Sequence, residues 1–425
     1  MYTNMKKNSD IPWQKQSPQT HVESSLQFID QHPNAMFTKL FSIDYKDYEV
    51  ATESPLKGAI FSIKDLFDVA GYQTKGGSVF LDKEPPAIED AEAVKKLREA
   101  GVVLIGHTNM TELAYSGLGL NPHYGTPEIP NQPGRIAGGS TSGGAASVAS
   151  GAADFALGTD TGGSLRIPAA FCGLTGFKPS QDSISRKGCL PLSPSLDAVG
   201  VISHTVAQCE FAWQVMSGNQ LPNPPTQNIT LVIPSNFGLD NLDEAVHKGF
   251  LNVIETLKAA NIKIEERALP FLEDYKLLPV WQFSAVESFN YYGERYDLNQ
   301  VEIDPRVKSR MDRAHSVSKE EFQTTLQKRE SLIAHYAEQG SVLLLPTVAI
   351  VAPRKSNLTD DKEYDRINLL CLRNTSLANV LDGCSISLPF QHEGENIGVM
   401  LITAKHKDNE MLSIAKHIES VLSGL

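Results

Sequence analysis

Short apolar runs alternate with amphipathic helical patterns along most of this 425-residue chain. "GAIFSIKD" (58–65) predicts a buried strand, "EDAEAVKKLREAG" (89–101) a helix and "VVLIGHTN" (102–109) the next strand. The alternation returns after residue 205, where "ITLVIP" (229–234) precedes the helical pattern of residues 242–260. Such a pattern predicts one large α/β domain, with a mixed, mostly parallel central sheet covered by helices.

Two segments depart from this alternation. Residues 1–20 are polar, and we expect a flexible N-terminal segment there, which leaves residues 21–425 for the single domain. Residues 271–340 are mostly helical by pattern, and residues 241–340 are a candidate helical insertion over one edge of the sheet. No repeat or linker divides the chain.

Composition and charge exclude several classes of protein. The net charge is −12 and no run of Lys and Arg exceeds two residues, so we expect no nucleic-acid partner. The longest apolar run, "VLLLPTVAIVAP" (342–353), is short and holds an internal proline, so we expect no membrane span. Five widely spaced cysteines without a C-x-x-C pair indicate reduced thiols in a cytoplasmic protein. No ligand spacing suggests a metal, and no cofactor motif is present.

The glycine- and serine-rich stretch "RIAGGSTSGGAASVASGAADFALGTDTGGSLRIPAAFCG" (135–173) holds the strongest candidates for chemistry. Ser164 follows "TDTGG" and precedes a predicted helix, and Ser140 lies in a similar turn. Successive glycine N–H groups can form a concave anion site, so a hydroxyl beside them would be a nucleophile next to an oxyanion hole. Each serine alone is equally typical of a helix N-cap.

Lys64 ends the predicted strand 58–65, where burial would lower the pKa of its ammonium group and allow it to act as a base. The alternative is an ion pair with Asp65 or Asp68. A base at this position requires both carboxylates to point away from it. The G-x-S-x-G, P-loop and H-E-x-x-H motifs are all absent from the sequence.

Taken together, Lys64 in "IKDLFDVAG" and the two serines, 24 residues apart, resemble the amidase signature family. The resemblance covers about residues 55–205, and it includes "TNMTELAYS" (108–116), "NPHYGTP" (121–127) and "SLDAVG" (195–200). A weaker similarity recurs at "LLLPT" (343–347) and "RNTSLANVLDGCSISLP" (373–389). One departure is Thr141, where the family often has a second serine.

The resemblance implies a Ser–Ser–Lys serine amidase that needs no cofactor. It hydrolyses the C–N bond of a small carboxamide to a carboxylic acid and ammonia or amine, through an acyl-enzyme on Ser164. Ser140, held by a cis peptide bond, relays the proton to neutral Lys64. The remaining implied roles are the oxyanion donors Thr161, Gly162 and Gly163 together with Ser164, the substrate-binding residues Ala114, Tyr115 and Gly139, and the supporting residues Asp160, Arg166 and Asp197.

Two other functions stay open at this stage. The chain is an alternative candidate for the amidase subunit of a tRNA-dependent amidotransferase, which would supply ammonia to a partner; its short length disfavours this. A non-catalytic binding protein would require loss of a triad residue, and all three are present. The sequence identifies neither the amide nor the oligomeric state, for which a homodimer is one candidate.

Overall fold

The structure is a computed structural model that describes residues 12–43, 52–219 and 229–423. The expected flexible segment lies partly outside these ranges, at residues 1–11. Its described part is folded, because a 3-10 helix, η2 (Pro12–Gln14), leads into α1 (Pro18–Gln31). Trp13 is buried against Phe155, and its ring N–H donates to the carbonyl of Pro55. The ordered chain therefore begins before residue 21.

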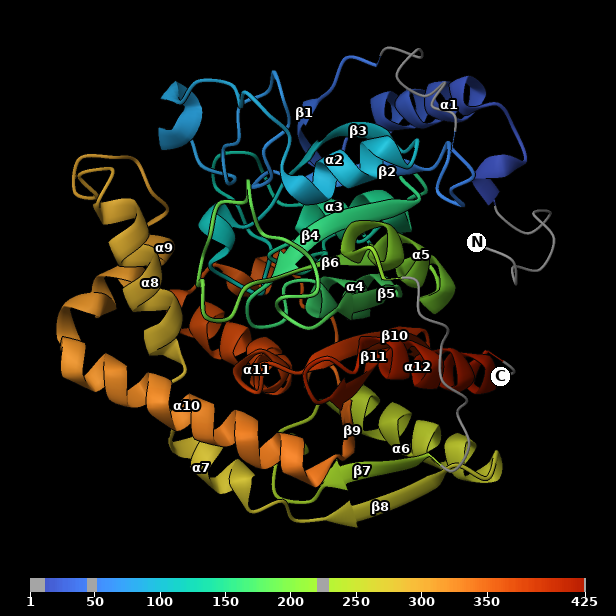
Figure 1. Ribbon diagram of the computed structural model, residues 1–425, viewed down its shortest axis with the longest axis vertical. Coiled ribbons are helices and arrows are strands. Elements are labelled where there is room, and N and C mark those ends of the chain that lie inside the picture. The colour runs from blue at the N-terminus through green and yellow to red at the C-terminus, as the bar shows by residue number, and fades with distance from the viewer. Residues whose placement is uncertain (1–11, 44–51, 220–228, 424–425) are drawn as a thin grey trace.

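One eleven-stranded sheet organises the described chain (Figure 1). In order across the sheet, its strands are β1 (Phe37–Leu40), β3 (Val103–Thr108), β2 (Ile60–Lys64), β4 (Phe155–Asp160), β6 (Ala198–Ser203), β5 (Thr175–Lys178), β10 (Cys384–His392), β11 (Glu395–Thr403), β9 (Val342–Pro346), β7 (Thr230–Pro234) and β8 (Lys263–Arg267).

The mixed α/β architecture agrees with the sequence prediction, but the expected parallel majority was wrong. Among the strand pairs of the described residues, four are parallel and six are antiparallel. The strand–helix alternation predicts parallel crossovers, whereas β10 and β11 form a hairpin and β6 enters the sheet antiparallel to β4 and β5.

Helices cover both faces of the sheet. They are α2 (Glu92–Glu99), α3 (Ser142–Ala149), α4 (Arg166–Cys172), α5 (Val206–Ser217), α6 (Glu244–Ala259), α7 (Phe271–Leu277), α8 (Trp281–Gly293), α9 (Pro305–Asp312), α10 (Lys319–Gln339), α11 (Asp361–Val380) and α12 (Asp408–Leu422). Short 3-10 helices are η4 (Phe80–Lys83), η5 (Glu112–Ala114), η6 (Arg313–Ser316) and η7 (Lys355–Leu358).

Alternation of side chains along the strands divides the core into layers. In β4, Leu157 packs in the layer that includes α2, α5, α6 and α12, whereas its neighbour Ala156 packs in the layer with α3, α4 and part of α11. The small side chains of α3 and the glycines around it allow close packing of this helix against β4. The second layer holds the glycine- and serine-rich stretch.

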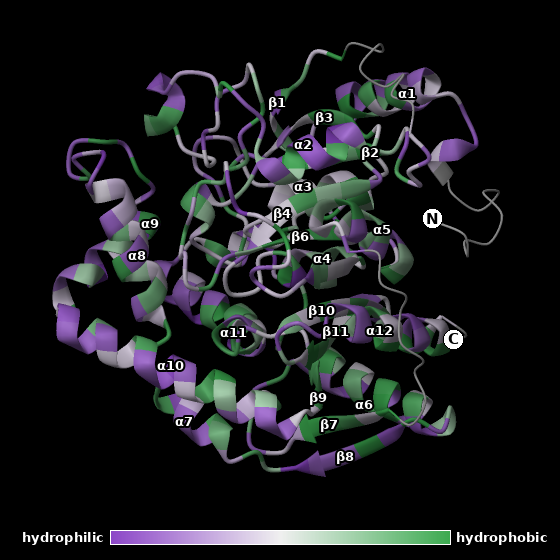
Figure 2. Ribbon diagram, in the orientation of Figure 1, coloured by the Kyte–Doolittle hydropathy of each residue, from purple (hydrophilic) through white to green (hydrophobic). Residues whose placement is uncertain are grey.

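The candidate insertion at residues 241–340 is not helical throughout, because a strand follows its first helix, α6. β8 lies within that range and forms the outer edge of the sheet beside β7, and α6 packs on β10 and β11. The helices from α7 to α10 gather at the left and lower left of Figure 1, away from α12. β8 is hydrophilic in Figure 2, and charged side chains on an edge strand discourage pairing with other chains.

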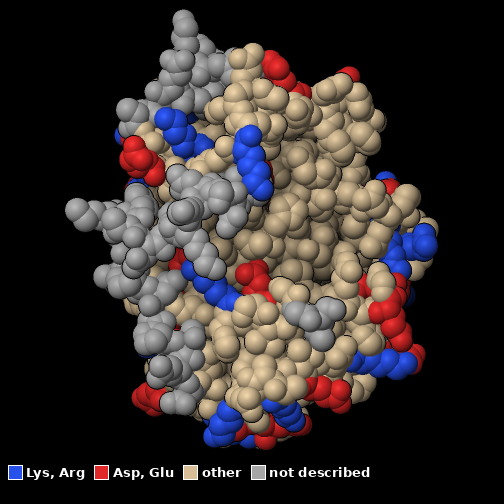
Figure 3. All heavy atoms as spheres, turned by 90° about the vertical axis from the view of Figure 1, so that its right-hand side faces the viewer, with Lys and Arg blue, Asp and Glu red and all other residues tan. Residues whose placement is uncertain are grey.

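Charged side chains of both signs are interspersed over the face shown in Figure 3, and the described atoms of this face form no basic stripe. The five cysteines are all free thiols. None of the helices in the described ranges combines the length and apolar character needed to cross a membrane.

Candidate active site

Lys64 is the last residue of β2 and is completely buried. Its Nζ lies 2.8 Å from Ser140 Oγ, 3.2 Å from Thr159 Oγ1 and 3.3 Å from the Thr159 carbonyl oxygen. Because β2 and β4 are parallel neighbours, the lysine meets the end of β4, from which the chain continues to Ser164. Burial lowers the pKa of Lys64 from 10.5 to about 7, although Asp160 and Asp197 oppose this shift. The amine can therefore give up its proton near neutral pH.

The two carboxylates that follow Lys64 in the sequence are engaged elsewhere. Asp65 accepts hydrogen bonds from Thr38 Oγ1 at 2.8 Å and from the Lys75 N–H at 3.1 Å. Asp68 accepts from Thr74 Oγ1 at 2.7 Å. Neither forms an ion pair with Lys64 in the described structure, which is the arrangement that a neutral lysine requires.

Ser140 lies between two glycines and α3. The Gly139–Ser140 peptide bond is cis, and the Ser140 carbonyl accepts a hydrogen bond from the Thr111 N–H. A Cβ at Gly139 would come within 2.5 Å of the Gly119 N, so glycine is required for this close backbone approach. The packing fixes the Ser140 hydroxyl against Lys64.

Ser164 lies between β4 and α4, in the second of the two glycine–serine turns. Its carbonyl accepts a hydrogen bond of 3.3 Å from the N–H of Thr141, so the backbones of the two turns are joined. Ser164 also lines a cavity, whereas Ser140 and Lys64 lie behind it, fully buried. The structure thus brings the three predicted residues into one region: Lys64 contacts Ser140, and the turn of Ser140 is hydrogen-bonded to the turn of Ser164.

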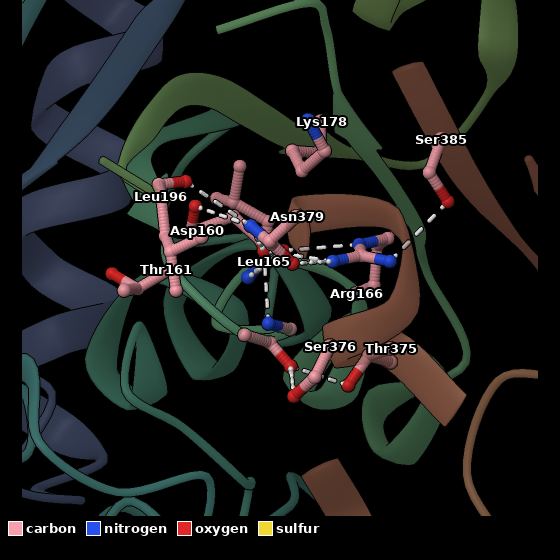
Figure 4. Close-up of polar contacts among 12 residues, drawn as sticks. Asp160, Thr161, Leu165, Arg166, Lys178, Leu196, Thr375, Ser376, Asn379 and Ser385 are labelled. Atoms are coloured by element: carbon pink, nitrogen blue, oxygen red, sulfur yellow. Dashed lines mark hydrogen bonds and ion pairs between the residues drawn. The ribbon is translucent and has the colours of Figure 1, made fainter. Parts of the chain in front are cut away.

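Asp160 holds the turn that carries Ser164 (Figure 4). Its carboxylate accepts from the N–H groups of Gly163 (2.8 Å) and Leu165 (3.1 Å), and from Arg166 Nη2 (2.8 Å) and Nε (3.1 Å). Asn379 of α11 adds a bond of 2.9 Å. Burial would raise the pKa of Asp160, but the Arg166 guanidinium and these donors hold it down at about 2. The charged carboxylate is therefore a permanent anchor for the loop.

The turn at residues 161–163 only partly matches the implied set of oxyanion donors. The Gly162 carbonyl accepts from Thr375 Oγ1 at 2.5 Å and from Ser376 Oγ at 3.3 Å, as Figure 4 shows. The following N–H, that of Gly163, is the one donated to Asp160. Gly163 therefore has a structural contact of its own, in a left-handed conformation with a φ of +134°.

Asp197 connects the same turn to the cavity wall. It accepts from Thr161 Oγ1 at 2.6 Å and from the N–H groups of Leu192 and Ser193, both at 3.0 Å. Burial raises the pKa of Asp197 to about 6, although these donors oppose the shift. Thr161 and Leu192 both line the cavity, so this carboxylate fixes two parts of one wall.

The cavity beside Ser164 has a volume of about 650 Å³. Ala114 and Tyr115, two of the three expected substrate-binding residues, line it, and Ala114 has a positive φ of +61°. Gly139, the third, packs beneath against Gly119 and is not among the described residues that line the cavity. Most of the remaining wall comes from the loop at 236–240, the helices between residues 275 and 313, and α11.

Sequence reasoning missed the contribution of α11. Thr375, Ser376 and Asn379 contact Gly162 and Asp160 across more than 200 residues of sequence. The similarity noted at residues 373–389 was the available signal, but it did not indicate which side chains face the loop. Within the described ranges, no group of three or more His, Cys, Asp or Glu side chains is arranged to hold a metal ion.

Comparisons with known proteins give one consistent result. A match to the Amidase family covers residues 40–412. The chain is 30% identical over 383 residues to 2-amino-5-chloromuconic acid deaminase of Comamonas testosteroni, covering 87% of this chain and 82% of the relative. It is 31% identical over 396 residues to indoleacetamide hydrolase of Pseudomonas syringae pv. syringae, covering 87% and 86% respectively.

Solved structures agree with these sequence matches. A crystal structure described as an amidase superposes with a TM-score of 0.87 at 28% identity, covering 96% of this chain and 97% of the other. The single large α/β domain, the mixed sheet and the resemblance to the amidase signature family were thus interpreted correctly from the sequence. The chain belongs to the amidase signature family, whose members are hydrolases that act on amides.

Proposed function

We propose that this protein is a serine amidase that hydrolyses the C–N bond of a small carboxamide to a carboxylic acid and ammonia or amine. The reaction passes through an acyl-enzyme on Ser164. The observation that carries this proposal is the 2.8 Å contact between buried Lys64 and Ser140, whose turn is hydrogen-bonded to that of Ser164, a serine that lines the cavity. The cavity volume of about 650 Å³ suits a small molecule.

Acylation begins with attack of Ser164 Oγ on the amide carbonyl carbon. The Ser164 proton passes to Ser140 Oγ, and the Ser140 proton passes to neutral Lys64 Nζ. When the C–N bond breaks, a proton returns through Ser140 to the leaving nitrogen. Water then attacks the ester, its proton follows the same relay, and cleavage of the bond to Ser164 releases the acid and restores the serine.

The oxyanion is held by N–H groups of Thr161, Gly162 and Ser164 in this proposal. Gly163 was included by resemblance, but its bond to Asp160 assigns its N–H to holding the loop. Asp160, Arg166 and Asp197 are positioning residues, since they contact the loop rather than the cavity. Ala114 and Tyr115 contact the acyl group of the substrate.

Ammonia release by the purified wild type and by Ser164→Ala tests the proposal. The variant lacks the nucleophile, so turnover of every amide substrate falls by about a thousandfold or more while the fold persists. Ser150→Ala is the matched control, because it changes a serine of the same stretch at the far end of α3. Retention of a tenth of the wild-type rate in Ser164→Ala would remove this residue from the role of nucleophile.

A further inference from the structure

The cavity carries a charge opposite to that of the chain. Four of its lining residues are cationic, Lys276, Arg310, Arg313 and Arg373, whereas Asp240 is the one acidic residue among the described lining residues. The chain as a whole has a net charge of −12. A local excess of cations in an acidic protein favours an anionic ligand in that cavity.

Three of these cations already have partners. Lys276 pairs with Glu273 at 2.9 Å. Arg310 pairs with Asp365 at 2.8 Å and donates to the Tyr115 carbonyl. Arg373 donates to the carbonyls of Gly238 and Asp240, and it lies 3.3 Å from the Asp240 carboxylate. Their charges are partly balanced by the protein itself.

Arg313 differs from the other three cations because it packs on an aromatic ring instead of pairing with a carboxylate of the described residues. Its guanidinium carbon lies 3.9 Å from the ring centroid of Trp281, which also lines the cavity. Within the described ranges, no carboxylate lies within ion-pair distance of Arg313. Contact with the indole face restricts the guanidinium and leaves its N–H groups free to donate, and their fork matches a carboxylate in geometry.

Arg313 lines the same cavity as Ser164. Burial raises the pKa of the Tyr115 phenol, and the positive charges of Arg310 and Arg313 oppose that shift, so both guanidinium groups lie near this ring. Tyr115 adjoins Ala114, and both line the cavity with Ser164. Leu192, Leu196 and Leu372 add apolar surface to the same cavity, which suits a carbon chain between two polar ends.

We infer that the substrate is an amide that carries a free carboxylate, and that Arg313 binds this carboxylate while Ser164 attacks the amide. The inference rests on the proposed function and adds the substrate class. Hydrolysis of such a monoamide consumes one water and yields a dicarboxylate and ammonia. Arg313 is thus a specificity-determining residue that does not take part in proton transfer.

The test compares matched amides that differ only at the end remote from the reacting bond. The pairs are succinamate and butyramide, glutaramate and pentanamide, and adipamate and hexanamide, with ammonia release as the readout. The wild type is expected to prefer the carboxylated member of at least one pair. Arg313→Gln lowers kcat/KM for that member by about ten- to a hundredfold, because one charged hydrogen-bonding partner is lost, and leaves the neutral member unchanged.

Two further variants separate charge from shape. Arg313→Lys keeps the charge without the planar fork, so it restores part of the preference. Arg295→Gln is the matched control, since Arg295 also lies over an aromatic ring, that of Tyr291, but is not among the described residues lining the cavity. It leaves the preference intact. Preference of the wild type for the neutral member of every pair, or equal losses on both members in Arg313→Gln, would overturn the inference.

Binding measurements test the recognition of a carboxylate independently of the proposed amide hydrolysis. Calorimetry with glutarate and butyrate measures recognition of the second carboxylate without turnover. The wild type is expected to bind glutarate more tightly, and Arg313→Gln binds the two alike. Equal binding by the wild type contradicts the inference even if amides are hydrolysed, whereas tight glutarate binding without hydrolysis of any amide contradicts the proposed function alone.

Discussion

Burial, rather than an ion pair, shifts the pKa of Lys64 at this site. Lys64 is enclosed, and the two acids that follow it in the sequence are occupied by Thr38, Thr74 and a backbone N–H. The apolar run before Lys64 was sufficient to predict its burial and the direction of its pKa shift. The orientations of the two aspartates depend on hydrogen bonds from Thr38, Thr74 and the Lys75 N–H, which the apolar pattern does not locate. From the sequence, we could state only that the mechanism requires both carboxylates to point away from Lys64.

In the proposed mechanism, the protonation state of a single residue, Lys64, sets the pH dependence of catalysis. Lys64 acts as a base only when unprotonated, so kcat/KM is low in acid, rises as the pH passes through about 7 and levels above it. Lys64→Ala is expected to flatten this rise and to lower the rate at least a hundredfold. Amides suffer more than activated esters, because the leaving amine needs the relayed proton.

Lys178→Met provides the control for that measurement. Lys178 is also buried, and it donates to the Pro179 carbonyl. The acid limb of the profile is expected to persist in this variant. An unchanged pH profile in Lys64→Ala, or equal losses on amides and esters, would show that another group is the base.

At the scale of elements, the site depends on the turn between β4 and α4 and on α11, which packs against it. The local pattern after Ser164 predicted the helix α4, because the signal for this short helix is contained within a few residues. The sequence did not indicate β5 or β6, since each is short and its direction is set by its neighbours in the sheet. The residues of α11 that contact the turn after β4 were not predictable either. They lie more than 200 residues away in the sequence and meet the turn only in the folded domain.

Gly163→Ala tests the fit between the turn and α11. Gly163 has a φ of +134°, and a Cβ there would overlap the side chain of Thr375. We expect kcat for amide hydrolysis to fall by at least tenfold, because the turn must shift away from Asp160 and α11. Gly151→Ala is the matched control: Gly151 also has a positive φ, +79°, but its Cβ would meet nothing within 4 Å.

The comparison is made on ammonia release and on thermal unfolding of both variants. Gly151→Ala is expected to lose about 1–2 kcal/mol of stability, because alanine is strained at a positive φ, and to keep its activity. Equal activity in the two alanine variants would mean that the Gly163 backbone does not position the reacting groups.

At the scale of the whole molecule, the cavity is assembled from segments that lie far apart in the sequence. Residues near 115, near 164, between 236 and 313, and on α11 all contribute to its wall. The similarity to a known family was enough to predict the fold and the family; the catalytic roles of Lys64, Ser140 and Ser164 stay a proposal. The cavity wall depends on how the helices between residues 271 and 339 pack, and local sequence periodicity does not specify that packing.

Arg166 links these distant parts of the chain. It donates to Asp160 and to Asn379 Oδ1 at 2.7 Å, and its other amino group reaches Ser385 Oγ at 3.3 Å. Arg166→Met leaves the Asp160 carboxylate buried without its cation, so we expect a loss of about 3–5 kcal/mol in the free energy of unfolding by urea. Arg366→Met, which breaks an exposed pair with Glu363, is expected to leave the free energy of unfolding nearly unchanged. Similar losses in both variants would contradict the linking role.

The central claim is that Ser164 carries the acyl group. The most direct measurement is peptide mapping by mass spectrometry after the purified protein is mixed with p-nitrophenyl butyrate and quenched in acid. The account predicts a butyryl adduct on the peptide that contains Ser164, and no adduct at any position in Ser164→Ala. A butyryl group that turns over on a different residue, or the same adduct in the variant, would contradict it.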